Sequence, residues 1–336
     1  MTGDSSLKRN AKIIATAMAV PEKIVPNAWF DALLGENVSA WLEENLTIRE
    51  RRWCNDNESA ADLAEAAARK VLEKAGLKAT DIDLLIVATD TPEFISPSTA
   101  SVLHERLKMD HGGTFDINTA CAGFVTAVDM GAKYIQADEQ YQRVLVIGAY
   151  AMSKYLNLKD KKTVTLFADG AGAVILEATQ EENKGWQGAL LHTEGQYNGW
   201  MGIYAGGTAA PMLPHNFEKA NPFLQFVKKF PKEINPQTWT KMIRELLIKI
   251  DRSADDVAMI FFTQININSI RETMGNLGLP MEKTHTVMDR YGYTGSACIP
   301  MALAEADSLG YLKPRDLVIF MGSGGGLAFG CNAFIW

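Results

Sequence analysis

Cys121 is the residue whose type and setting point most clearly to chemistry. It follows a strand-like segment, residues 115–117, and small residues, and a helical pattern begins directly after it at Phe124. A thiol in the first turn of a helix lies close to unpaired backbone N–H groups and to the positive end of the helix dipole. Because the thiolate is the reactive form, the sequence predicts a lowered pKa and a nucleophilic role for Cys121. The alternative is a small buried residue in a strand-to-helix turn.

An internal repeat organises the elements that must position this thiol. A helical segment precedes a buried strand in each half of the chain, first at residues 63–89 and again at residues 239–264. The offset that aligns Ile82 with Val257 also aligns Cys121 with Ser296. A later strand and a later glycine turn are repeated too, which makes a chance match improbable.

The repeat predicts the architecture. Continuous apolar strands that alternate with helices indicate mostly parallel sheets covered on both faces. Two such halves, packed through their helices, give a five-layered α/β/α/β/α fold. We expect an N-terminal half at residues 1–180 and a C-terminal half at residues 239–336. The segment between them, residues 181–238, does not repeat clearly and is expected to cap or line a pocket or to cover a subunit interface.

Composition narrows the class of protein. The chain has 336 residues, of which 47% are hydrophobic and 22% are charged, as is usual for a globular protein. Its net charge of −7 argues against a general nucleic-acid-binding surface. The first residues form no apolar leader, and no apolar run approaches the ~18 residues of a membrane span, so we expect a cytoplasmic protein without membrane association. The four cysteines have the spacing of neither a disulfide framework nor a metal site.

Four motifs occur in order along the chain. They are Thr-Ile-Arg-Glu-Arg at residues 47–51, Asp-Ile-Asn-Thr-Ala-Cys-Ala-Gly-Phe at 116–124, Leu-Phe-Ala-Asp-Gly-Ala-Gly-Ala at 166–173 and Gly-Gly-Gly-Leu-Ala-Phe-Gly at 324–330. With these motifs the sequence resembles the thiolase superfamily, and within it the β-ketoacyl-acyl carrier protein synthase III group. The resemblance covers nearly the whole chain.

This resemblance implies a function. It implies a homodimer with the thiolase-like fold and acyl transfer to Cys121 from a thioester of coenzyme A or of acyl carrier protein. No permanently bound cofactor is expected. The backbone N–H groups of Cys121 and Gly326 match the oxyanion hole of the family, and glycine suits that role because the backbone must approach the substrate closely.

Further positions match substrate-binding residues of the family. Trp41 matches the tryptophan that stacks on the adenine of coenzyme A, and Asn266 and Gly325 match positions beside the substrate. Glu93 lies in a loop that in the family reaches across the dimer toward the partner's acyl pocket, where it would serve as a base. Two basic positions of the family pattern are Asn45 and Asn268 here, which weakens the expectation of standard donor binding.

The sequence departs from the family at two catalytic positions. Thr263 occupies the position of the catalytic histidine, and Tyr293 occupies that of the catalytic asparagine. Both side chains that polarise the carbonyl of a decarboxylating malonyl thioester are therefore absent, so we do not expect standard malonyl condensation. A neutral threonine cannot replace imidazole as a base near pH 7. His285 and Glu93 are candidate substitutes, each with a structural role as its alternative.

Two functional hypotheses follow. The first is an acyltransferase of the synthase III type that forms an acyl-Cys121 thioester. It would pass the acyl group to a carbanion, an amine or a hydroxyl in fatty-acid-related or secondary metabolism. The second is a catalytically silent or impaired subunit that forms a heterodimer with an active paralogue. The retained Cys121 favours the first hypothesis, and the lost histidine and asparagine favour the second.

Overall fold

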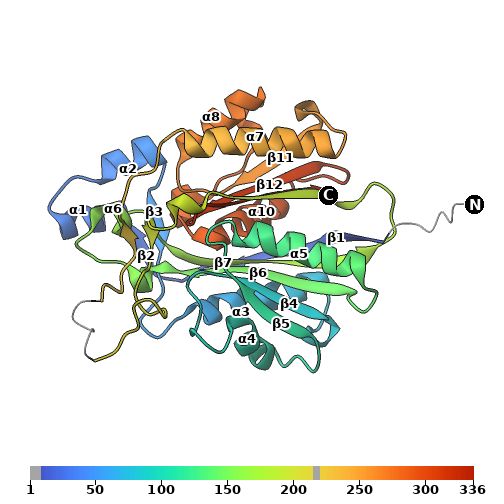
Figure 1. Ribbon diagram of the computed structural model, residues 1–336, viewed down its shortest axis with the longest axis horizontal. Helices are drawn as coiled ribbons and strands as arrows, with labels where there is room; N and C mark the ends of the chain where they lie inside the picture. The colour runs from blue at the N-terminus through green and yellow to red at the C-terminus, as the bar shows by residue number, and fades with distance from the viewer. Residues whose placement is uncertain (1–8, 215–219) are drawn as a thin grey trace, which may run out of the picture.

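The computed structural model describes residues 9–214 and 220–336, and the start of the chain, where no leader was expected, lies outside them. Two sheets organise the fold (Figure 1). The first sheet has the order β1-β7-β6-β4-β5 and the second has the order β11-β12-β13-β8. The strands of the first sheet are β1 (Asn10–Ala19), β4 (Leu84–Ala88), β5 (Gly113–Ile117), β6 (Arg143–Ala151) and β7 (Asp169–Thr179). Those of the second sheet are β8 (Gly185–Thr193), β11 (Val257–Phe262), β12 (Leu317–Gly324) and β13 (Ala328–Ile335).

The topology of the sheets confirms the repeat. The order β4-β6-β7-β1 in the first sheet corresponds to β11-β12-β13-β8 in the second, with one parallel pair followed by two antiparallel pairs in each. The expectation of mostly parallel sheets is wrong, because both sheets are mixed. The reason is local: a short glycine turn joins β12 to β13, and only antiparallel strands can be joined by such a turn.

Six helices complete the five predicted layers. Figure 1 shows α5 and α10 between the two sheets, α3 and α4 on the outer face of the first sheet, and α7 and α8 on the outer face of the second. Their bounds are α3 (Ala60–Ala75), α4 (Thr99–Leu107), α5 (Gly123–Ala137), α7 (Ile234–Lys249), α8 (Ile267–Leu277) and α10 (Cys298–Ser308). Three apolar clusters fill the spaces between the layers. Burial of these faces removes apolar surface from water and is the main driving force for the layering.

Shorter elements gather mainly at one end of the sheets. They are α1 (Asn27–Leu34), α2 (Ser39–Leu46), α6 (Lys161–Val164), α9 (Met288–Tyr291), β2 (Ile24–Pro26), β3 (Glu50–Arg52), β9 (Met201–Gly202) and β10 (Gln225–Phe226). The 3-10 helices are η1 (Ala79–Asp81), η2 (Met152–Tyr155), η3 (Gly195–Tyr197), η4 (Ala254–Asp256), η5 (Met281–Lys283) and η6 (Gly295–Ala297). In the described parts of the chain, no helix has the length and apolar character needed to cross a membrane.

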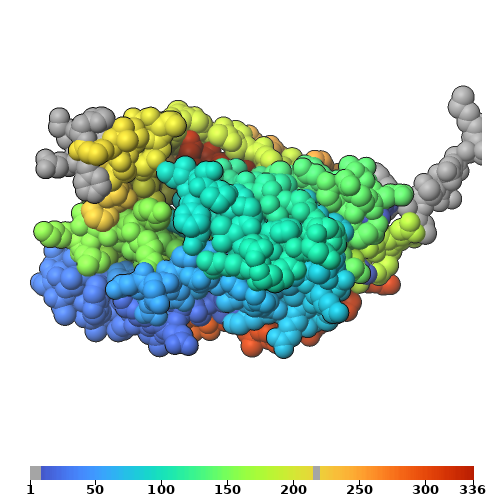
Figure 2. Space-filling view, turned by 90° about the horizontal axis from the view of Figure 1, so that it is seen from below, coloured from blue at the N-terminus to red at the C-terminus, as the bar shows by residue number. Residues whose placement is uncertain are grey.

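The segment 181–238 divides between two structural roles. Residues 185–193 form β8, the edge strand of the second sheet, so they belong to the C-terminal repeat. Residues 234–238 are the first turn of α7. The described residues between these elements form a projection that includes the β9–β10 pair (Figure 2, yellow). This projection reaches the pocket described below.

Candidate active site

Cys121 lies in the short connection between β5 and α5. The helix begins at Gly123, so the thiol stands just before its first turn rather than within it. Ala120 has a φ of 47°, a left-handed conformation that is uncommon for a residue other than glycine. The side chain of Asn118 supports this turn by accepting a hydrogen bond from the backbone N–H of Ala120 at 3.0 Å. This turn leads directly into Cys121, which lines the pocket described below.

The pKa of Cys121 is raised well above its ordinary value. Burial is the largest cause, since only 2% of the residue is exposed, and the negative charge of Asp90 is the next. A hydrogen bond with the Tyr293 hydroxyl acts in the opposite direction but does not outweigh them. The prediction of a lowered pKa is therefore wrong, because desolvation of a thiolate exceeds the stabilisation available at the start of a helix.

A pocket of about 800 Å³ opens onto this thiol. Five residues that the sequence pointed to line it together: Cys121, Tyr293, Trp41, Asn266 and Gly325. The projection contributes further lining residues, including Met201, Phe226 and Phe230. The structure thus brings most of the expected site residues to one cavity, which includes the nucleophile.

The hydroxyl group of Tyr293 lies beside the thiol of Cys121. Its backbone is fixed by hydrogen bonds with Leu166 and Ala168, each of 2.9 Å, and its ring lies 5.3 Å from that of Phe167. The residue is 1% exposed, and burial raises the pKa of its phenol well above 10, so the hydroxyl stays protonated. Tyr293 is therefore a neutral hydrogen-bond donor beside Cys121.

Thr263 follows β11, where the family resemblance placed the catalytic histidine, but its hydroxyl does not line the pocket. The hydroxyl donates to the backbone carbonyl of Ser323 at 3.2 Å and accepts from the backbone N–H of Ser323 at 2.9 Å. The side chain is fully buried. Its hydrogen bonds tie the end of β11 to β12, which is a structural role.

The triple glycine packs against the loop of the nucleophile. A Cβ at Gly324 would lie 2.4 Å from the backbone nitrogen of Cys121, which no side chain tolerates, whereas Gly325 has ordinary clearance. Gly326 adopts a φ of 132°, which favours glycine. Gly324 and Gly325 line the pocket and Gly326 directly follows them. The backbone of this turn therefore lies next to the space where a thioester carbonyl would react.

The mouth of the pocket carries an exposed tryptophan and several cations. Trp41 of α2 is 55% exposed. Four lysines also line the cavity: Lys161, Lys162, Lys229 and Lys232. Asn268, which replaces a basic residue, instead donates to the backbone carbonyl of Asn45 at 3.1 Å. Positive charge at the mouth thus comes from α6 and from the projection.

The two candidate substitute bases are held elsewhere within the chain. The Nε2 atom of His285 lies 2.8 Å from Glu305, which is also bound by Arg290. Glu93 accepts a hydrogen bond from the backbone N–H of Ala61 at 3.2 Å and lies 3.7 Å from Arg106. Neither side chain is among those that line the pocket.

Asp90 acts electrostatically on the nucleophile, and the sequence reasoning did not single it out. Its charge raises the pKa of Cys121, Tyr150 and Tyr155, so it acts on the cluster of titratable side chains around the nucleophile, although it does not line the pocket. Cys298 belongs to the same cluster. The available signal was an acidic residue two positions after a wholly apolar strand, where the carboxyl ends of parallel strands meet.

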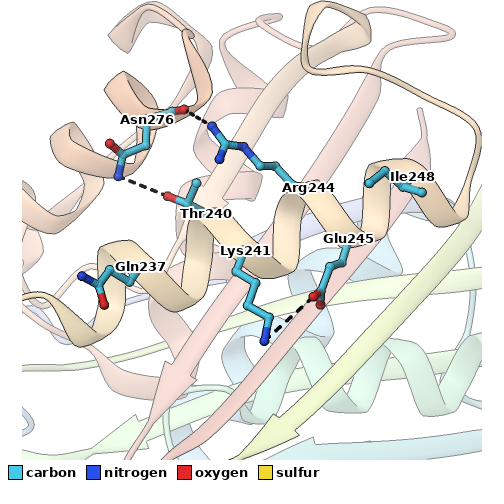
Figure 3. A pocket seen from close by; sticks show the side chains of 7 residues that line it. All are labelled: Gln237, Thr240, Lys241, Arg244, Glu245, Ile248 and Asn276. Carbon is cyan, nitrogen blue, oxygen red and sulfur yellow. Dashed lines mark hydrogen bonds and ion pairs between the residues drawn. The ribbon is translucent and has the colours of Figure 1, made fainter.

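A second hollow lies on the outer face of α7 (Figure 3). Its polar groups bind one another: Arg244 donates to the carbonyl of Asn276 at 2.6 Å, and Lys241 lies 3.9 Å from Glu245. Its seven lining residues do not include the nucleophile. Among the described residues, no group of three or more His, Cys, Asp or Glu side chains is placed to hold a metal ion.

Comparison with known proteins identifies the family. Residues 115–195 match the family described as 3-oxoacyl-[acyl-carrier-protein] synthase III, and residues 247–336 match its C-terminal family. A β-ketoacyl-[acyl-carrier-protein] synthase III of Clostridium perfringens is 35% identical over 326 residues, which cover 96% of this chain and 98% of that protein. The corresponding protein of Natranaerobius thermophilus is 33% identical over 333 residues, covering 97% and 99%.

A solved structure agrees with these matches. The 3-oxoacyl-[acyl-carrier-protein] synthase III of Aquifex aeolicus superposes with a TM-score of 0.87 at 28% identity, covering 97% of this chain and all (100%) of that one. The resemblance seen in the sequence is therefore confirmed. This chain belongs to the β-ketoacyl-[acyl-carrier-protein] synthase III family of the thiolase superfamily.

Proposed function

We propose that this protein is an acyltransferase that carries an acyl group on Cys121. The observation that supports it most strongly is the placement of Cys121 in a large pocket together with the Tyr293 hydroxyl and the triple-glycine backbone. A thiol, a neutral donor and a close backbone turn are the components that thioester exchange requires.

The reaction begins with attack of the Cys121 sulfur on the carbonyl carbon of a thioester. The new carbon–sulfur bond forms, the bond to the donor thiol breaks, and the proton of Cys121 leaves with that thiol. The acyl group is then held as a covalent thioester. In the transition state, the developing oxyanion takes hydrogen bonds from the backbone N–H groups of Cys121 and Gly326.

The donor is a thioester of coenzyme A or of acyl carrier protein. Coenzyme A carries an adenine and phosphates, and the prosthetic arm of the carrier protein is attached through a phosphate. Trp41 offers an exposed ring for stacking, and Lys162, Lys229 and Lys232 offer positive charge, whereas Lys161 pairs with Glu36 at 2.6 Å. These residues support recognition of such a donor without the cations that Asn45 and Asn268 replace.

The acceptor reaction differs from standard malonyl condensation. Decarboxylation builds an enolate that needs two donors at its oxygen, and the Thr263 hydroxyl is already bonded to Ser323. Loss of one such donor costs a factor of about 100–1,000 in rate. We therefore propose transfer to a carbanion that is already activated, to an amine or to a hydroxyl.

The active unit is a homodimer. The loop after β4 exposes two large apolar side chains, Phe94 (52% exposed) and Ile95 (84% exposed). Exposed apolar side chains of this size are characteristic of a protein interface when they lie together. In this arrangement the loop that holds Glu93 lies next to the partner subunit.

Intact-protein mass measurement tests the proposal. The wild-type protein and Cys121→Ala are incubated with acyl-coenzyme A and acyl-carrier thioesters of different chain length. We expect an added acyl mass on the wild type that is absent from Cys121→Ala. With malonyl thioester present, the acyl enzyme should persist without a condensation product. No adduct with any donor would refute the proposal.

A silent subunit of a heterodimeric ketosynthase is the second candidate. The raised pKa of Cys121 and the occupied hydroxyl of Thr263 favour it. On this reading the chain binds a paralogue and contributes contacts but no chemistry. The same mass measurement separates the two, because a silent subunit forms no adduct alone or with its paralogue.

A further inference from the structure

Glu305 of α10 binds two side chains of the segment that leads to Tyr293. Its Oε1 atom lies 2.8 Å from the Nε2 atom of His285. Its two oxygens also accept a bidentate pair of hydrogen bonds from Arg290, at 2.9 and 2.7 Å. Because an ionised carboxyl group only accepts hydrogen bonds, the Nε2 atom of His285 carries a hydrogen here. One carboxylate therefore fixes the segment at residue 285 and again at residue 290.

The charge of Glu305 makes these contacts strong. Its side chain is 13% exposed, so little water is available to replace its partners. Burial opposes the charged form, but hydrogen bonds from Arg290 and His285 outweigh burial and hold the pKa of Glu305 below its ordinary value. Charge-assisted bidentate pairs also restrict the geometry of both partners. Loss of the carboxylate would leave two polar side chains without their partner and release the segment that they fix.

The fixed segment leads directly to the pocket. Arg290 belongs to α9, and the backbone N–H of Gly292 closes this helical turn by donating to the carbonyl of Met288 at 3.0 Å. Gly292 has a φ of 62°, and Tyr293 follows it. The backbone of Tyr293 is bonded to residues 166 and 168, so a shift of α9 would turn Tyr293 about these bonds. The position of α9 therefore sets the direction of a side chain that lines the pocket together with Cys121.

We propose that Glu305 is a positioning residue for Tyr293. Through its bonds to residues 285 and 290, it holds the Tyr293 hydroxyl against the thiol of Cys121. Glu305 is not among the residues that line the pocket, so it acts through Tyr293. The inference rests on the proposed function only in its consequence for acylation. Loss of Glu305 should weaken the hydrogen bond from the hydroxyl to the sulfur and slow the reactions that use the thiolate.

Alkylation of Cys121 by iodoacetamide measures this effect without any acyl donor, because the reagent reacts with the thiolate. Glu305→Gln keeps the shape of the side chain and removes its charge. At fixed pH it should slow alkylation of Cys121 by about 10-fold, since a hydrogen bond to a charged group is worth about one pKa unit or more. In the Tyr293→Phe background the same change should have little effect, because the hydroxyl is already absent.

The matched control is Glu177→Gln, which breaks a comparable ion pair with Arg143, of 2.9 Å, in the first sheet. It should leave alkylation of Cys121 unchanged in both backgrounds. Acylation kinetics give a second readout. Single-turnover acylation by Glu305→Gln should be slower, while the donor concentration that gives half the maximal rate should stay as in the wild type. A large change in that concentration would indicate a distorted pocket and count against the inference.

Each outcome decides the question. Slower alkylation that depends on the Tyr293 hydroxyl supports the inference. Equal slowing in both backgrounds, or an unchanged rate in both, overturns it. Should Glu305→Gln not fold, Arg290→Lys takes its place in the same two backgrounds, because lysine keeps the charge and loses the bidentate geometry. If alkylation follows the expected pattern but the wild type forms no acyl adduct, the proposed function has failed and this inference stands.

Discussion

Replacing Asp90 with asparagine should stabilise the protein at neutral pH, by an amount that can be worked out from burial. Burial raises the pKa of Asp90 from its ordinary 3.8 to about 6. Between about pH 4 and pH 6 the folded protein therefore keeps a proton that the unfolded chain has lost. The free energy of unfolding of the wild type must fall as the pH rises through this window. Two pKa units correspond to about 3 kcal/mol.

The expected result is a pH-dependent difference between two proteins. Asparagine is neutral at every pH, so the free energy of unfolding of Asp90→Asn should lack this decline. The variant minus wild-type difference should rise by about 3 kcal/mol from pH 4 to pH 7.5. Urea unfolding followed by tryptophan fluorescence, at fixed protein concentration, measures it.

The control is Asp255→Asn, because Asp255 is exposed and its difference from the wild type should stay flat. A flat difference for Asp90→Asn would refute the reasoning, since it would mean that the carboxyl group is solvated or partnered in the folded protein. A difference that falls with rising pH would show that the charged form is stabilised instead.

Three further predictions concern the residues around the nucleophile. Gly324→Ala should slow acylation about 100-fold or more in single-turnover assays, because its Cβ would displace the Cys121 backbone. The control Gly325→Ala, where a Cβ has ordinary clearance, should keep most of the activity. Equal losses in the two variants would contradict this. Thr263→Val should lower the free energy of unfolding by about 1–3 kcal/mol, because it loses the two hydrogen bonds with Ser323. The rate of acylation should stay nearly unchanged. A large loss of acylation would instead place the Thr263 hydroxyl in the mechanism. Tyr293→Phe should raise the pKa of Cys121 further, because the hydrogen bond that lowers it is lost, and should therefore slow alkylation of Cys121 at fixed pH. An unchanged rate of alkylation would mean that the Tyr293 hydroxyl does not reach the sulfur.

The fold could largely be predicted because the same pattern of helices and strands occurs in both halves of the sequence. The match of Ile82 with Val257 located β4 and β11, and the match of Cys121 with Ser296 located the turns that lead into the two central helices. The relative directions of the strands were harder to predict from the sequence. The pairing of β8 with β13 joins residues far apart in the sequence, and nothing in residues 185–193 alone marked them as the edge of the second sheet.

The positions of the site residues could be predicted from the sequence better than the pKa of the nucleophile. The positions of Cys121 and Tyr293 could be found by motif, and both line the pocket. The pKa of Cys121 could not be predicted from the sequence, because it depends on burial and on the charge of Asp90, and both depend on the assembled structure. The partner of Thr263 is Ser323, sixty positions along the chain, so its structural role also required the fold.

The central claim is that Cys121 itself carries the acyl group, and peptide mapping after acylation tests it most directly. The protein is quenched in acid after incubation with an acyl-coenzyme A and is then digested without reductant. We predict the acyl mass on the peptide that contains Cys121 and on none of the peptides that contain Cys54, Cys298 or Cys331, which are also free thiols. Acyl groups distributed among these cysteines, or unmodified Cys121 beside another labelled residue, would contradict the account.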